Sequence, residues 1–118
     1  MTSKETLITL YGCRDMLTLI ETPKLDFHHI IKECNGGPRT VKNGALLEKP
    51  SHNWLHSLEN QDIELYLLIN ECFQLYKKCI DLKQQGLIDM YEQEVVPEVR
   101  RILTLKIKDP DYRRKLAL

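Results

Sequence analysis

Four histidines are the side chains of this sequence best suited to metal binding and proton transfer, and they fall into two pairs. The first pair is the dipeptide His28-His29, and the second is His52 and His56, which are four residues apart. A spacing of four residues places two side chains on one face of a helix. A neutral imidazole can bind Zn, Ni or Mn, and it can also accept a proton near neutral pH. The histidines therefore predict a metal site with a base beside it.

The segments around these histidines must place them close together. The β-branched and aromatic residues from Phe27 to Ile31 predict a strand that carries the first pair. Neighbouring strand residues point to opposite faces, so the two histidines of this pair can have different tasks. A loop over residues 32–41 leads to a second apolar run at 45–47, and Pro50-Ser51 is typical of a helix start before the second pair. The expected order is strand, loop, strand, helix.

This arrangement of a doubled histidine, an asparagine and an H-x3-H helix resembles the HNH endonuclease family, and in particular its bacteriocin (colicin-type) DNases. The resemblance covers roughly residues 13–58 and implies an α+β fold with a ββα-metal core. It makes His29 the general base and Asn43 the orienting residue. It makes His28, His52 and His56 the ligands of one divalent ion, which could be Zn, Mg, Mn or Ni.

Hydrolysis of a phosphodiester at neutral pH explains the need for these residue types. The reaction requires a base for the attacking water and a cation for the developing charge. Arg39 is the best candidate to grip the substrate phosphate, because a guanidinium binds phosphate oxygens in a bidentate manner. Lys32 and Lys42 lie nearby in the sequence and are expected to assist it. The Gly36-Gly37 pair in the same loop fits either a loop that wraps a ligand or a plain connector.

The cysteines predict no disulfide framework. Cys13, Cys34, Cys72 and Cys79 lack the spacing of a secreted scaffold, so reduced thiols in the cytoplasm are expected. Many members of the HNH family hold a structural zinc with two C-x-x-C pairs. The corresponding positions here are Cys13 with Met16 and Glu48 with Ser51, so a structural zinc is not expected.

Charge is balanced overall but unevenly distributed. Seventeen basic and seventeen acidic residues cancel, which is unusual for a protein that binds nucleic acid unaided. Residues 57–99 carry three basic and nine acidic side chains, whereas residues 100–118 carry seven basic and two acidic ones. The basic C-terminal tail is therefore either a phosphate-attracting surface or a solvated end.

The remaining chain predicts mostly helix within a single domain, residues 1–118, in which 60–118 form a helical extension of the core. A capped helix is expected over residues 4–11, and a strand or extended segment over 16–21. A longer helix over 60–85 has two apolar rows, which favours packing within the chain over a coiled-coil homodimer. Gly86 is expected to break this helix, and another is expected to begin over 87–94. Pro97 is expected to kink or restart that helix, with a final helix over 97–108.

The favoured function is metal-dependent cleavage of DNA. DNA is therefore the expected partner, and a protein partner or a homodimer through residues 60–85 is a further possibility. The alternative is an HNH-fold module that binds nucleic acid or protein without cleaving. A third interpretation is a protein that binds zinc only to fold. No apolar run is long enough to cross a membrane, so no membrane association is expected. The N-terminus shows no signal-peptide pattern, so a cytoplasmic location is expected.

Overall fold

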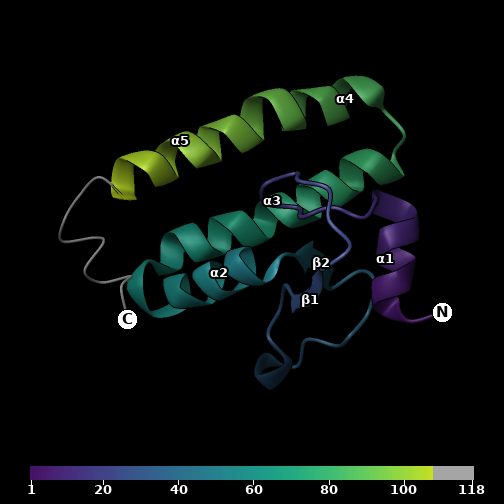
Figure 1. The fold of residues 1–118 in the computed structure, drawn as a ribbon, viewed down its shortest axis with the longest axis horizontal. Helices are drawn as coiled ribbons and strands as arrows, with labels where there is room; N and C mark the ends of the chain where they lie inside the picture. Colours follow the sequence, from purple (N-terminus) through teal and green to yellow (C-terminus); the bar gives the residue numbers. More distant parts are fainter. Residues whose placement is uncertain (108–118) are drawn as a thin grey trace. The chain divides into compact units, whose positions relative to one another are not determined.

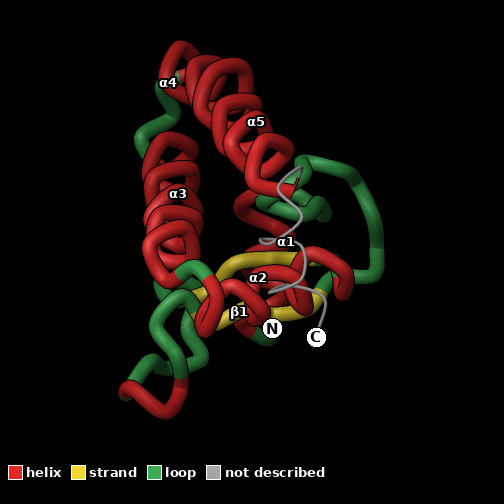
Figure 2. Tube along the Cα trace, turned by 90° about the vertical axis from the view of Figure 1, so that its left-hand side faces the viewer, coloured by secondary structure: helices red, strands yellow, loops and turns green. Residues whose placement is uncertain are grey.

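The computed structural model describes residues 1–107 and has an α+β fold, as predicted (Figures 1 and 2). Its elements, in chain order, are α1 (Ser3–Tyr11), β1 (Asp26–His29), the 3₁₀ turn η1 (Glu33–Asn35), β2 (Gly44–Leu47), α2 (Lys49–Gln61), α3 (Ile63–Asp81), α4 (Gln85–Met90), the π-helical η2 (Tyr91–Val95) and α5 (Val96–Ile107). The chain divides into two compact units, Met1–Asn53 and the part from Trp54 onward. The predicted basic tail at 108–118 lies outside the described residues.

The strands β1 and β2 form an antiparallel hairpin, so the expected order of strand, loop, strand and helix is confirmed. In their register, His28 lies opposite Ala45 and His29 lies opposite Gly44. The predicted extension of the first strand to Ile31 is wrong, because β1 ends at His29. Beyond that point the backbone N–H and C=O of Ile31 bond to the Asn43 side chain instead of to a neighbouring strand.

Helix α1 forms where its capping residues predict it. The Thr2 hydroxyl accepts a hydrogen bond from the Glu5 N–H at 3.1 Å, and Gly12 ends the helix with a φ of 92°. Within the first unit, α1 contacts β2. A Cβ atom at Gly44 would lie 2.8 Å from a Leu7 methyl and 2.5 Å from the Phe27 ring, so this close approach requires glycine.

Residues 16–18 form a turn, and beyond it Glu21 forms only an isolated antiparallel bridge with Arg14, so the regular strand predicted over 16–21 is not present. Asp15, which is 0% exposed, explains the turn. One oxygen of its carboxylate accepts the N–H groups of Leu17 and Thr18 at 2.7 and 2.8 Å. The other accepts the N–H of Glu48, between β2 and α2, at 2.8 Å. The carboxylate therefore ties this turn to the start of the histidine-bearing helix.

The predicted helix over 60–85 is divided and shortened. Helix α2 continues to Gln61, and α3 starts anew because the Asp62 side chain caps it by accepting the Leu65 N–H at 3.3 Å. The helix ends at Asp81 and is followed by Lys83 with a φ of 53°. Gly86 lies inside α4, so the predicted break at this glycine is wrong.

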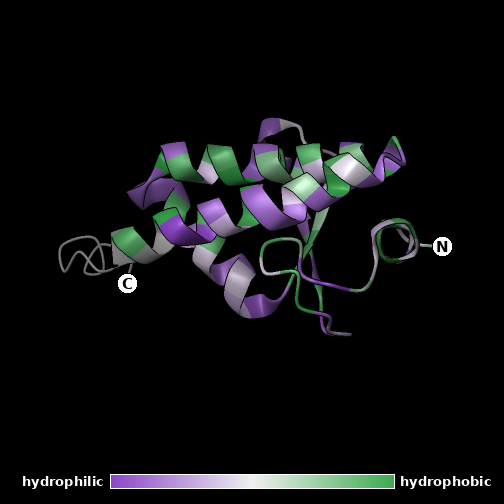
Figure 3. Cartoon of the chain, turned by 90° about the horizontal axis from the view of Figure 1, so that it is seen from above, coloured by the Kyte–Doolittle hydropathy of each residue, from purple (hydrophilic) through white to green (hydrophobic). Residues whose placement is uncertain are grey.

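The two apolar rows of α3 have different environments. Figure 3 shows hydrophobic and hydrophilic residues alternating along the helices. One row is largely buried and includes Tyr66, Ile69, Phe73 and Tyr76. Tyr76 stacks on Tyr91 with 4.7 Å between ring centroids, and its hydroxyl donates to Glu92 at 2.8 Å. Packing within the chain therefore uses this row, as favoured from the sequence, while much of the other row stays exposed.

Pro97 restarts the α-helix after a π turn. A proline inside a helix has no N–H to donate, and its ring crowds the carbonyl four residues earlier, here that of Gln93. The π-helical segment Tyr91–Val95 widens the helix at this place, and α5 starts at Val96. The predicted effect of Pro97 is therefore seen as a local change of helix type in a chain that remains helical.

Candidate metal centre

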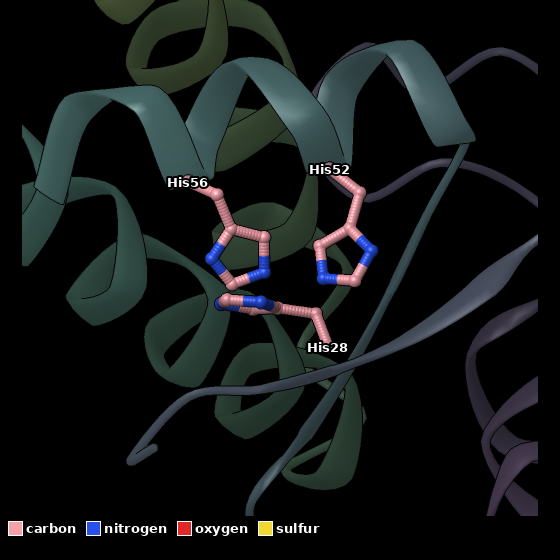
Figure 4. Close-up of side chains that lie close together, drawn as sticks. All are labelled: His28, His52 and His56. Carbon is pink, nitrogen blue, oxygen red and sulfur yellow. The ribbon is translucent and has the colours of Figure 1, made fainter.

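Three of the four histidines lie together. His28 projects from β1 and is 1% exposed, while the half-buried His52 and the exposed His56 project from α2. Helix α2 is continuous from Lys49 to Gln61, so these last two are one helical turn apart. A potential ligand nitrogen from each of the three histidines lies within 4.8 Å of the others (Figure 4). The three predicted metal ligands are therefore close enough together to hold a metal ion.

Two carboxylates orient the imidazoles of α2. His52 Nδ1 lies 3.3 Å from an Asp26 oxygen, and His56 Nδ1 lies 2.9 Å from a Glu59 oxygen. A carboxylate at Nδ1 favours the proton on that nitrogen and leaves Nε2 with a lone pair for a metal. The sequence reasoning missed both carboxylates. Their signal was the spacing, because Asp26 precedes His28 by two residues on a strand and Glu59 follows His56 by three on a helix.

The donor set fits a transition metal. Three neutral imidazoles bring no negative charge, and they suit Zn, Ni or Mn, whereas Mg prefers oxygen ligands. A nitrogen–metal distance of about 2.0–2.1 Å requires the nitrogens to be at most about 4.2 Å apart. The three nitrogens lie within 4.8 Å of one another, so small side-chain shifts bring them to this spacing. Three protein ligands also leave a coordination position for water or substrate.

His29 lies outside this cluster, on the other face of β1. Its ring meets the edge of Phe27 with 5.0 Å between centroids, and the Arg39 guanidinium lies 4.4 Å from the centroid of the same phenyl ring. The alternation predicted for the two adjacent histidines is therefore present. One aromatic ring thus contacts both the predicted base and the predicted phosphate-binding arginine.

Asn43 fastens the loop between the strands. Its side-chain nitrogen donates to the carbonyls of Ile31 and Pro38 at 3.0 and 2.9 Å, and its oxygen accepts the Ile31 N–H at 2.8 Å. Its own backbone carbonyl accepts the Ile30 N–H at 2.9 Å. A Cβ atom at Gly37 would lie 1.8 Å from the Ile31 carbonyl oxygen, so the loop requires glycine there. Asn43 therefore fixes the backbone that directly follows His29.

The two lysines flank this loop. Lys32 is half-buried just before η1, and Lys42 is exposed just before Asn43. Their part in phosphate binding stays a prediction.

Hydrogen bonds join the two segments to which the sequence resemblance assigned the positions of a structural zinc. The Met16 N–H donates to the Leu46 carbonyl at 2.8 Å, near the bond between Asp15 and Glu48. Cys13 is exposed, and all four cysteines are free thiols.

Comparison with known proteins gives no family assignment. No family model, curated protein or solved structure matches this chain. Among residues 1–107, no helix has the length and apolar character that crossing a membrane requires. Function is therefore inferred from the geometry of the histidines and of the residues that hold them.

Proposed function

We propose that this protein is a metal-dependent endonuclease of the HNH type that hydrolyses phosphodiester bonds in DNA. The three-histidine cluster on a strand and the helix after it carries this proposal. Asn43 adds support, because it braces the backbone beside His29 with three side-chain hydrogen bonds.

The histidines have separate roles in the proposed reaction. His28, His52 and His56 would hold a divalent ion, which would supply positive charge to stabilise the charge that develops during hydrolysis. His29 accepts a proton from the attacking water as the water oxygen bonds to phosphorus. The bond from phosphorus to the leaving oxygen breaks, and that oxygen then takes up a proton from solvent. A positioned base of this kind contributes about 10²–10⁴-fold to the rate.

Arg39 is the proposed phosphate-binding residue. Its guanidinium is held against Phe27, which also contacts His29, so the arginine is positioned on the same side of β1 as the base. From there it can offer two parallel N–H groups to phosphate oxygens. The balanced net charge of the chain predicts modest affinity for DNA that weakens further as salt rises.

The test is nicking of supercoiled plasmid with added Ni, Mn, Zn or Mg. We expect cleavage by the wild type. We expect none by the His52→Ala/His56→Ala double variant, and a loss of about 10²–10⁴-fold for His29→Ala with metal affinity retained. Asn53→Ala is the matched control, since this exposed residue lies between the two histidines on the same helix. It should cleave like the wild type.

Other outcomes separate the other interpretations. A gel shift of DNA without nicking would indicate a binding module. Unfolding by a chelator, without nicking or DNA binding, would indicate a metal that serves only the fold. Wild-type nicking by the double variant would overturn the assignment of the metal site.

A further inference from the structure

The exposed face of α3 carries a regular apolar line. Leu68 and Leu75 of α3, and Leu82 directly after its last residue, are 41%, 46% and 53% exposed, and they are separated by seven residues each. Seven residues are close to two helical turns, so the three side chains form one nearly straight line. Large apolar side chains at this spacing are typical of a seam between two helices. In residues 1–107 of this chain, the seam is open to solvent.

Two charges flank the central leucine. Glu71 precedes Leu75 by four residues, and Lys78 follows it by three, and both are exposed on the same side of the helix. Neither side chain forms a salt bridge within the described part of the chain. The face is therefore an apolar line with one acidic and one basic group placed almost symmetrically about its centre.

We propose that this face binds a second copy of the chain, with the two α3 helices antiparallel and a two-fold axis through Leu75. In this arrangement each Leu68 lies beside the partner's Leu82, and each Glu71 lies beside the partner's Lys78. A parallel pair would instead bring Glu71 against the partner's Glu71. Charge complementarity thus selects an antiparallel second copy, and a two-fold axis makes one patch serve both subunits.

The dimer is weak. The line from Leu68 to Leu82 covers about 20 Å of helix at 1.5 Å per residue. A contact of that length between two helices buries less than the roughly 1,600 Å² of a standard interface. We expect a dissociation constant on the order of 10–100 µM, which lies in the range where concentration decides the oligomeric state. The proposal does not depend on the metal site or on nuclease activity.

Charge reversal tests the pairing. Analytical ultracentrifugation of the full chain, in reductant and low salt from about 5 µM to 1 mM, should show a reversible dimer. Glu71→Lys and Lys78→Glu should each weaken it about tenfold, and the variant with both changes should recover most of the wild-type affinity. Glu94→Lys, which changes an exposed charge on η2, is the matched control and should dimerise normally. A monomer at every concentration, or a double variant no better than the singles, would overturn the proposal.

Cross-linking tests the direction of the helices. In a background with Cys13→Ser and Cys34→Ser, mild oxidation should link Leu75→Cys to itself, because that position lies on the two-fold axis. Leu68→Cys should not link to itself, since the two copies of that residue would be about 20 Å apart. Efficient linking through Leu68→Cys would show a parallel dimer and overturn the antiparallel arrangement.

Discussion

At the level of single residues, the candidate metal centre depends on two carboxylates as well as on three histidines. Asp26 and Glu59 contact the Nδ1 atoms of His52 and His56. Partners of this kind fix the tautomer and the orientation of an imidazole, and they raise its basicity as a ligand. The centre therefore has a preorganised pair of donors on α2 before any metal arrives.

Removing the charge of these carboxylates should weaken metal binding. We expect Asp26→Asn and Glu59→Gln each to lower the affinity for Zn or Co by about 10–100-fold, as measured by competition titration with a chelating dye. Glu33→Gln, at an exposed position in η1, is the control and should bind like the wild type. Unchanged affinity in both variants would mean that the carboxylates do not position the ligands.

At the level of secondary-structure elements, the hairpin of β1 and β2 and the loop that joins these strands position His28 and His29. Antiparallel pairing fixes the height of His28 along the sheet. Asn43 then closes the loop with three side-chain hydrogen bonds and is 5% exposed. The buried side-chain amide of Asn43 thus holds the loop by hydrogen bonds to its backbone, where longer strands would otherwise hold it through strand pairing.

Truncating this side chain should destabilise the first unit. Asn43→Ala leaves the N–H of Ile31 and two carbonyls without their partner, so we expect a loss of about 2–4 kcal/mol in the free energy of unfolding. Asn35→Ala, at an exposed site in the same loop, should change it by less than about 0.5 kcal/mol. Urea denaturation followed by circular dichroism measures both. Equal stability of the two variants would contradict the proposed clamp.

For the molecule as a whole, one buried charge sets a pH dependence of stability. Lys77 lies on α3 and is 3% exposed. Burial lowers its pKa from 10.5 to about 8, against an opposing influence of Asp81. Between these two pH values the folded chain binds fewer protons at this site than the unfolded chain does. The contribution of Lys77 to stability is therefore unfavourable below pH 8, and it becomes more favourable as pH rises toward 10.5.

Replacing this amine by an apolar group of similar length should remove that dependence. We expect Lys77→Met to be more stable than the wild type by about 1–2 kcal/mol at pH 7, since the lost attraction to Asp81 offsets part of the relieved burial penalty. The difference should shrink as pH rises above about 8, in urea denaturation followed over roughly pH 7–10. Lys24→Met, at an exposed position, should show no such trend. A gain that stays constant with pH would contradict the assigned pKa.

Features that depend on local spacing could be predicted from the amino-acid sequence alone. The four-residue separation of His52 and His56 indicated one helical face, Thr2 and Gly12 marked the ends of α1, and the strand pair around Asn43 followed from its apolar runs. Periodicity and capping act within a few residues, so they can be read without the fold. The choice of His28 as the third member of the cluster came from the family resemblance.

Only the tertiary structure shows which residues far apart in the sequence come into contact. Asp26 reaches His52 across 26 residues, and Asp15 reaches the backbone of Glu48 across 33. The same holds for α3, where two apolar rows are equivalent in sequence, yet Phe73 is buried and Leu75 is exposed. The type and spacing of a side chain indicate which interactions it can make, but its partner depends on how the rest of the chain packs.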